Sequence, residues 1–188
     1  MLNMRLRKIR MTFLVLCVCM LAVSLTGCGN ALKAGIKQME SGDYQKAAES
    51  FQKVIDKGED TKEVYRGLGM ALYEQGDYAG ALSALQTGLD NGMEETPQMY
   101  NLMGLSAMET GDYASAAQYF VTGTALADAR ASEETIDGEL LREMRFNAVV
   151  CYEKALDWAN AKEKAAEYLE DYPDDEEMIR EAEFLQTR

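Results

Sequence analysis

The residues that could do chemistry in this chain are few, and they match no catalytic set. The 188 residues include 32 acidic and 19 basic side chains but no His, so acid–base chemistry would fall to carboxylates, Tyr or Cys. The sequence has no Gly-rich phosphate loop, no nucleophile elbow and no Cys-x-x-Cys pair. Its acidic run "EDYPDDEE" lacks the alternating oxygens and central Gly of a Ca²⁺ loop. We therefore predict a protein that is not an enzyme and uses no cofactor or metal.

One cysteine, Cys28, stands at the end of a targeting pattern. Residues 1–10 carry four positive charges and no negative one, and they precede the apolar run "MTFLVLCVCMLAVSL" and the small residues of "TGCGN". This order is typical of a secretory signal peptide. A retained anchor helix is the alternative, because the uncharged stretch continues to Leu32.

The four residues Leu25-Thr26-Gly27-Cys28 resemble the lipobox of bacterial lipoproteins. The resemblance implies that residues 1–27 are a signal peptide, that cleavage precedes Cys28, and that a diacylglycerol is attached to the Cys28 sulfur. Two acyl chains hold a protein stably on a membrane. The resemblance therefore implies a domain anchored by lipid to the bacterial cell membrane, on its extracytoplasmic side. The alternative is a Cys that only lies near a cleavage site.

The charge of the remaining chain excludes one class of partner. Loss of residues 1–27 removes four basic residues and no acidic one, which takes the formal charge from −13 to −17. Such a domain is repelled by nucleic acid, so we predict no nucleic-acid partner. The acidity suits either solubility or a basic protein partner. Cys151 is the one thiol left unmodified, and we expect it to be packed in the interior.

A short motif recurs along the chain and predicts its architecture. It reads "SGDYQKAAESF" at 41–51, "QGDYAGALSAL" at 75–85 and "TGDYASAAQYF" at 110–120, and its Gly residues are 34 and 35 residues apart. Such a period is typical of a solenoid of helix pairs. We expect the Gly to end one helix in the left-handed conformation and the following Asp to cap the next helix.

These residues resemble the tetratricopeptide repeat, a pair of antiparallel helices. The matching segments are 28–61, 62–95, 97–130 and a degenerate copy at 142–175, in which Leu156-Asp157-Trp158 replaces Gly-Asp-Tyr. The resemblance implies an all-α domain at 28–188, a right-handed α-α superhelix of about four helical hairpins with a C-terminal capping helix at about 175–187. That helix carries an apolar stripe of Met178, Ile179, Ala182 and Leu185.

An insert at about 131–141 interrupts the period before the last copy. We expect the insert to lengthen the flanking helices, with Ser132 or Asp137 capping the later one. A partner-specific loop is the alternative, because inserts in solenoids often lie on the binding side.

In this family the first helix of each pair lines a concave surface, and three positions per repeat face it. These positions are occupied by Leu32, Ile36, Met39, Arg66, Met70, Tyr73, Asn101, Leu105, Met108, Phe146, Val150 and Glu153. We call these twelve residues the inner row. Because the row is apolar and rich in Met, we predict that it binds an amphipathic helix or an extended apolar peptide of a protein partner. The alternative is that part of the inner row is ordinary core.

The resemblance thus favours an adaptor or scaffold in a cell-envelope assembly, bound to the membrane through Cys28. A structural subunit that associates with itself into a homo-oligomer, without a peptide partner, is the alternative function.

Overall fold

The computed structural model describes residues 30–58, 62–130 and 137–188, and every regular element in these ranges is a helix. The first helix covers residues 30–40. It is followed by α2 (Tyr44–Ile55), α3 (Lys62–Glu74), α4 (Tyr78–Asp90), α5 (Pro97–Glu109), α6 (Tyr113–Arg130), α7 (Gly138–Lys154), α8 (Trp158–Asp171) and α9 (Glu176–Leu185). The signal peptide and Cys28 lie outside the described residues, as does Ser132. None of the helices in these ranges has the length and hydropathy that a bilayer crossing requires.

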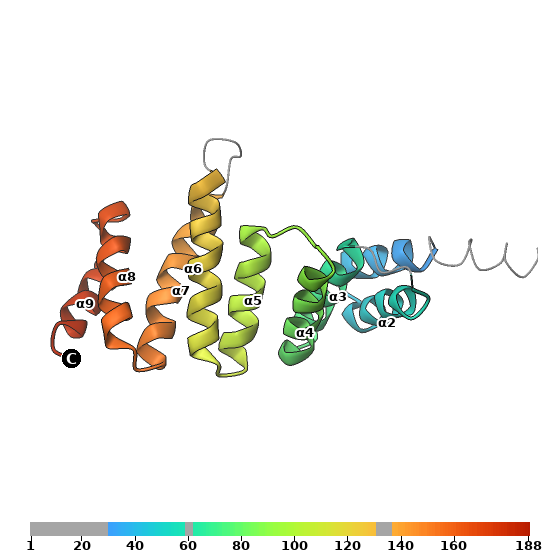
Figure 1. The fold of residues 1–188 in the computed structure, drawn as a ribbon, viewed down its shortest axis with the longest axis horizontal. Coiled ribbons are helices and arrows are strands. Elements are labelled where there is room, and N and C mark those ends of the chain that lie inside the picture. The colour runs from blue at the N-terminus through green and yellow to red at the C-terminus, as the bar shows by residue number, and fades with distance from the viewer. Residues whose placement is uncertain (1–29, 59–61, 131–136) are drawn as a thin grey trace, which may run out of the picture.

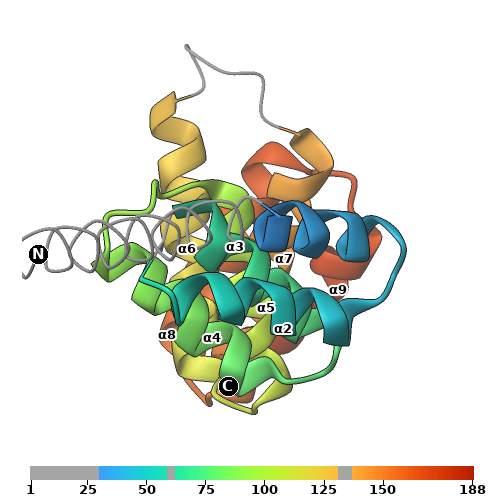
Figure 2. The ribbon, with the colours of Figure 1, turned by 90° about the vertical axis from the view of Figure 1, so that its right-hand side faces the viewer.

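The helices form hairpins that stack side by side into one extended array (Figure 1). Each helix packs on the next one along the chain, and α3 also contacts α5, as α5 contacts α7. The first helices of successive hairpins are therefore neighbours along one side. Figure 2 looks along this array from the end that holds residues 30–40. The predicted fold class is confirmed: an all-α superhelix of helical hairpins, closed at its C-terminal end by α9.

Local chemistry explains the turn inside each hairpin. Gly42, Gly76 and Gly111 have φ angles of 73°, 80° and 79°. This left-handed conformation is easily accessible to Gly and ends the preceding helix. The Asp that follows each Gly accepts a hydrogen bond from a main-chain N–H in the first turn of the next helix, as in Asp77 to the Gly80 N–H at 3.0 Å. In the fourth turn Leu156 adopts the same conformation, with φ 60°.

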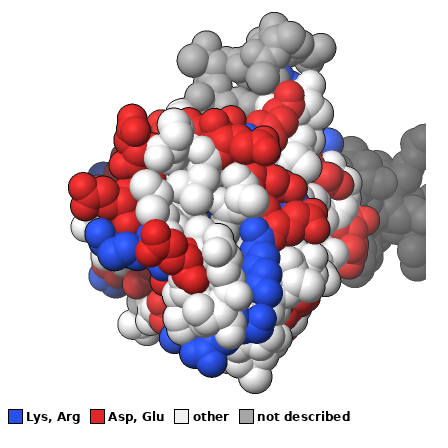
Figure 3. Space-filling model, turned by 90° about the vertical axis from the view of Figure 1, so that its left-hand side faces the viewer, with Lys and Arg blue, Asp and Glu red and all other residues white. Residues whose placement is uncertain are grey.

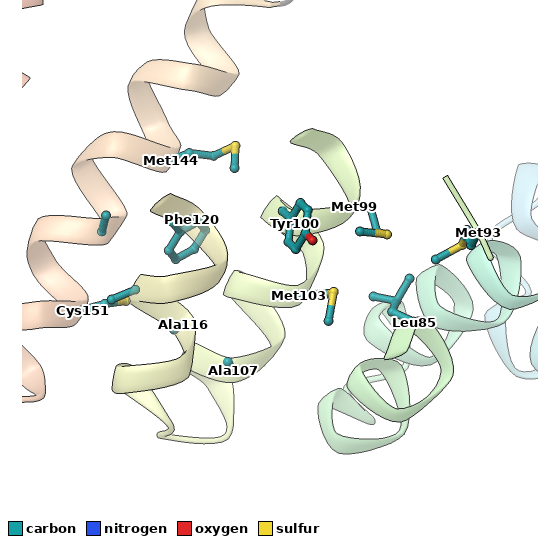
Figure 4. Packing of buried hydrophobic residues seen from close by; sticks show 12 residues of the cluster. Leu85, Met93, Met99, Tyr100, Met103, Ala107, Ala116, Phe120, Met144 and Cys151 are labelled. Atoms are coloured by element: carbon teal, nitrogen blue, oxygen red, sulfur yellow. The ribbon is translucent and has the colours of Figure 1, made fainter. Parts of the chain in front are cut away.

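Large side chains pack against Gly where helices cross closely. Figure 4 shows the buried residues around one such crossing, with Phe120, Ala116 and Ala107. Phe120 of α6 is fully buried, and its ring lies so close to Gly104 of α5 that a Cβ there would be 2.6 Å from it. Ala107 and Ala116 are also buried at this crossing. Met144 of α7 joins the same cluster, so the central core ties α5, α6 and α7 together.

The extra residues before the last repeat lengthen the helices on both sides of them. α6 has 18 residues and α7 has 17, whereas α4 and α5 have 13 each. Asp137 caps α7, because its Oδ1 accepts a hydrogen bond from the Glu139 N–H at 3.0 Å. Residues 131–136 of the insert lie outside the described ranges.

The closing helix α9 is fixed at its start by a polar cluster. Asp175 caps α9 by accepting from the N–H groups of Glu177 and Met178. Its Oδ2 also accepts from the Arg142 guanidinium at 2.8 Å and from the Tyr168 hydroxyl at 2.7 Å. The hydrogen bond from Arg142 holds the pKa of Asp175 well below its usual range. Asp175 therefore joins α7, α8 and α9 through charge-assisted hydrogen bonds.

The apolar stripe predicted for the closing helix is wrong at one position. Met178 and Leu185 are fully buried and Ala182 is half-buried, but Ile179 is 36% exposed.

Replacing Asp175 with Ala is expected to destabilise the domain, because α9 loses its cap and Arg142 loses its partner. Loss of a cap alone costs about 0.5–2 kcal/mol. The contribution of Asp175 is complete above the pKa of the unfolded chain, about 3.9, and is lost as the pH falls towards the lowered pKa of the folded state. Urea denaturation at neutral pH measures the effect. Asp174→Ala is the matched control, and equal losses in both variants would contradict this role for Asp175.

Candidate binding groove

The residues that α3 and α5 turn towards each other enclose a hollow of about 390 Å³. Five members of the inner row line it: Arg66, Met70, Tyr73, Asn101 and Leu105. We call this space the central hollow. Its other lining residues are Glu74, Leu85, Thr96, Gln98, Met99 and Leu102.

Helical spacing explains why these side chains meet. Arg66, Met70 and Tyr73 are four and three residues apart on α3, and Asn101 and Leu105 are four apart on α5, so each set shares one helix face. Leu85 of α4 also lines the hollow. A Cβ at Gly69 would lie 2.7 Å from the Leu85 side chain, so this helix pair is closely packed behind the hollow.

The walls of the central hollow are mainly apolar, and one of the side chains that form them, Met70, is flexible. Met70 is 44% exposed, and its unbranched side chain can adopt many conformations. Tyr73 packs edge to face on Tyr78, with ring centroids 5.4 Å apart, and burial raises the pKa of Tyr73. Leu105 is half-buried and also contacts the central core. The hollow is therefore suited to an apolar side chain of a partner.

Two polar groups in the central hollow have unsatisfied hydrogen-bonding atoms. Arg66 Nε and Asn101 Oδ1 are shielded from solvent, and neither has a partner within the described part of the chain. Glu153 Oε1, further along the inner row, is the third such atom in that part. Buried polar atoms are nearly always hydrogen-bonded in native proteins, so each exception requires an explanation. All three lie on the inner row.

The rest of the inner row does not enter the central hollow. Leu32 and Met39 pack against the first core cluster, Met108 against the central one and Phe146 against the last, where its ring lies edge to face on Tyr168. Ile36 is exposed and Val150 is half-buried. None of the twelve residues is fully buried. The structure thus gathers only the middle of the predicted row, and several outer members serve partly as core walls.

Sequence reasoning did not include Thr96, Gln98, Met99 and Leu102 in the site. Thr96 caps α5, because its Oγ1 accepts from the Met99 N–H at 3.2 Å, and Pro97, Gln98 and Met99 lie in the first turn. Leu102 lies about one turn further along the helix. The Thr-Pro pair is a helix-start signal that would have placed this turn beside the predicted row.

A second hollow, of about 270 Å³, lies between α6, α7 and α8, and its two basic side chains are paired with carboxylates of the protein. Arg145 forms ion pairs with Asp128, at 2.8 Å, and with Asp171, while Lys164 pairs with Glu167. Figure 3 shows the C-terminal end of the array, where carboxylates gather beside a narrow band of Lys and Arg. No group of acidic or Cys residues in the described ranges could hold a metal ion.

Cys151 is fully buried in the central core, and burial raises the pKa of its thiol to about 12. The thiol is therefore protonated at neutral pH, and a protonated thiol is a poor nucleophile.

Comparison with known proteins identifies the repeats. Two family models, each described as a tetratricopeptide repeat, match the chain: one at residues 32–96 and 68–128, the other at 143–175. Among curated protein sequences, none matches.

Solved structures share the fold at low sequence identity. MamA of AMB-1 superposes with a TM-score of 0.65 at 18% identity, covering 84% of this chain and 80% of that one. YrrB, described as a TPR protein with an unusual peptide-binding site, superposes with a TM-score of 0.66 at 15% identity. The match covers 84% of this chain and 75% of YrrB. PcrH, solved in complex with the chaperone-binding region of PopB, superposes with a TM-score of 0.54 at 21% identity. The match covers 64% of this chain and 93% of PcrH.

Proposed function

The chain belongs to the tetratricopeptide repeat family, and on this basis we propose that it is an adaptor that binds a peptide segment of another protein in the central hollow. The observation that carries the proposal is an apolar hollow in which Arg66 and Asn101 hold unsatisfied polar atoms. The descriptions of YrrB and PcrH, which bind peptide or protein segments on the same fold, support it. Fold alone does not determine function, and it is the residues of the central hollow that favour a peptide ligand.

A peptide segment supplies the groups that the central hollow lacks. Each peptide unit carries a carbonyl that can accept from Arg66 Nε–H and an N–H that can donate to Asn101 Oδ1. In the unbound state the walls shield both atoms, so a partner must displace a side chain to reach them. Met70 lines the same hollow and is flexible and exposed, which makes it the side chain that can move.

We also propose that lipid on Cys28 holds this domain on the extracytoplasmic side of a bacterial cell membrane, within a cell-envelope assembly. The support is the order of charges and apolar residues in 1–27 and the four residues that resemble a lipobox. The first described helix begins at Asn30, two residues after Cys28. A lipid at that position would keep the first hairpin close to the bilayer surface, with almost no tether.

Replacing Met70 with Glu is expected to weaken peptide binding at least about tenfold, which is a loss of about 1.4 kcal/mol. The new carboxylate would stand one helical turn from Arg66 and place a charge in an apolar space. Peptides selected from a displayed library on the full-length protein supply the ligands, and fluorescence anisotropy measures their affinities.

Ile179→Glu is the matched control, because Ile179 is also a large exposed apolar residue but lies on α9, away from the central hollow. Its affinities should equal those of the unchanged protein. If Met70→Glu binds the selected peptides as tightly as Ile179→Glu does, the central hollow is not the binding site. Light scattering that shows a stable dimer dissociated by Met70→Glu would favour the self-associating subunit instead.

A further inference from the structure

The central hollow carries opposite charges at its two ends. Arg66 is the only cation among the residues that line it, and Glu74 is the only anion. The two residues are eight positions apart on α3 with Met70 midway, so about 12 Å of helix axis separates them at 1.5 Å per residue. Steps of four residues keep the three side chains along one side of α3. The hollow therefore has a positive end, an apolar middle and a negative end.

Neither charge is paired within the described part of the chain. The Arg66 guanidinium is half-buried and forms no ion pair or hydrogen bond there, and its Nε is shielded from solvent. The Glu74 carboxylate is exposed and also has no ion-pair partner among these residues. Glu109 takes the equivalent place on α5, since each Glu stands two residues before the Gly of a turn. Because a shielded charge is costly without a partner, a ligand carboxylate beside Arg66 would be stabilising.

The unsatisfied atoms of the central hollow favour an extended peptide over a helical one. Arg66 Nε–H needs an acceptor and Asn101 Oδ1 needs a donor, and an extended main chain offers free C=O and N–H groups. In a helix most of these groups are already paired with each other. Alternate side chains of an extended segment point the same way, and a rise of about 3.3 Å per residue places residues i and i+4 about 13 Å apart. This spacing matches the separation of Arg66 and Glu74 along α3.

We propose that the central hollow selects an extended segment in which an acidic, an apolar and a basic residue occupy positions i, i+2 and i+4. The acidic side chain accepts from the terminal N–H groups of Arg66, which remain free because Nε–H is only one of five guanidinium donors. The apolar side chain lies against Met70 and Leu105, and the basic side chain pairs with Glu74. This inference rests on the proposed function, to which it adds the chemistry of the peptide.

The test uses peptides selected from a displayed library on the full-length protein in non-ionic detergent. We expect the three-residue pattern to recur among the peptides whose binding Met70→Glu weakens. Fluorescence anisotropy then measures the affinity of one such peptide for further variants. Arg66→Gln should weaken binding about tenfold, and Glu74→Gln about threefold because Glu74 is exposed.

Double-mutant cycles between peptide and protein assign each charge to its partner. Replacing the acidic residue of the peptide with its amide should remove most of the effect of Arg66→Gln. Replacing the basic residue with Gln should do the same for Glu74→Gln, and the two crossed combinations should be additive. Glu40→Gln is the matched control, because Glu40 is an exposed Glu at the equivalent place in the first repeat and does not line the central hollow. It should leave the affinity unchanged.

The outcomes separate this inference from the proposed function. If the selection yields no peptide, or if Met70→Glu leaves the affinities unchanged, the proposed function is wrong and this inference with it. If Met70→Glu weakens binding but the matched cycles show no coupling, or the crossed cycles couple as strongly, only the peptide pattern is overturned. Should Arg66→Gln fail to fold, as judged by circular dichroism, the cycle with the exposed Glu74 still decides the question.

Discussion

Replacing Phe120 with Ala is expected to lower the free energy of unfolding by about 3–5 kcal/mol. Phe120 is 0% exposed and belongs to the central cluster that ties α5, α6 and α7 together. Its ring lies against Gly104 and fills the space that the missing side chain of Gly104 leaves. Removing the ring leaves a cavity that the crossing helices can close only in part, so packing contacts and hydrophobic burial are both lost.

Urea denaturation followed by circular dichroism measures this loss. The matched control is Phe184→Ala, because Phe184 is 39% exposed on α9 and its removal opens no cavity in the core. We expect Phe184→Ala to lower the free energy of unfolding by well under half as much as Phe120→Ala does. If the two variants lose similar stability, the packing role argued for Phe120 is wrong.

Gly104 permits a sharper test of the same contact. Gly104→Ala alone should destabilise the domain, because its Cβ would lie 2.6 Å from the Phe120 ring. In the Phe120→Ala background the same change meets no ring, and Ala is favoured over Gly in a helix by about 1 kcal/mol. A double-mutant cycle should therefore show Gly104→Ala changing from destabilising to neutral or stabilising.

Replacing Cys28 with Ser is expected to abolish lipid attachment completely, since a hydroxyl at that position offers no sulfur for the thioether. Metabolic labelling with a radioactive fatty acid in the bacterial host measures the incorporation, and mass spectrometry identifies the first residue of the processed chain. We expect an acylated Cys28 as the first residue of the unchanged protein and background label in Cys28→Ser. Loss of the lipid should greatly weaken membrane binding, because each buried CH₂ of an acyl chain contributes about 0.8 kcal/mol to it.

Cys151→Ser is the matched control for the labelling experiment. Cys151 is fully buried and its thiol is protonated at neutral pH, so its replacement should leave the label unchanged. Label that persists in Cys28→Ser would show that the lipobox resemblance is misleading. An unprocessed chain that is equally membrane-bound in both variants would support the retained anchor helix.

Much of this fold could be predicted from the sequence, because its turns depend on neighbours in the chain. The Gly that ends one helix and the Asp that caps the next interact with groups three to five residues away, as between Asp112 and Ser115. Such contacts form wherever the motif occurs, so the recurrence of Gly-Asp-Tyr was sufficient to predict helical hairpins and their period. The same reasoning offered Ser132 or Asp137 as the cap of the helix after the insert, and in the structure Asp137 caps α7.

The candidate site could be predicted only in part. The resemblance to the repeat family placed Arg66, Met70 and Asn101 on the concave surface, but it did not determine which members of the inner row a neighbouring helix would cover. That depends on how closely the hairpins stack, and hence on the Gly and Phe residues at each crossing. Thr96 and Met99 line the central hollow from the start of α5, although neither belongs to the inner row.

The sequence by itself determined the local elements of this protein: where helices begin and end, and which face of each is apolar. Only the tertiary structure decided which distant groups meet. Arg142 reaches Asp175 across 33 residues and Tyr168 across 26. The reason is physical: caps and turns depend on a few adjacent dihedral angles, whereas burial, a shifted pKa or a hollow depends on the packing of several helices together.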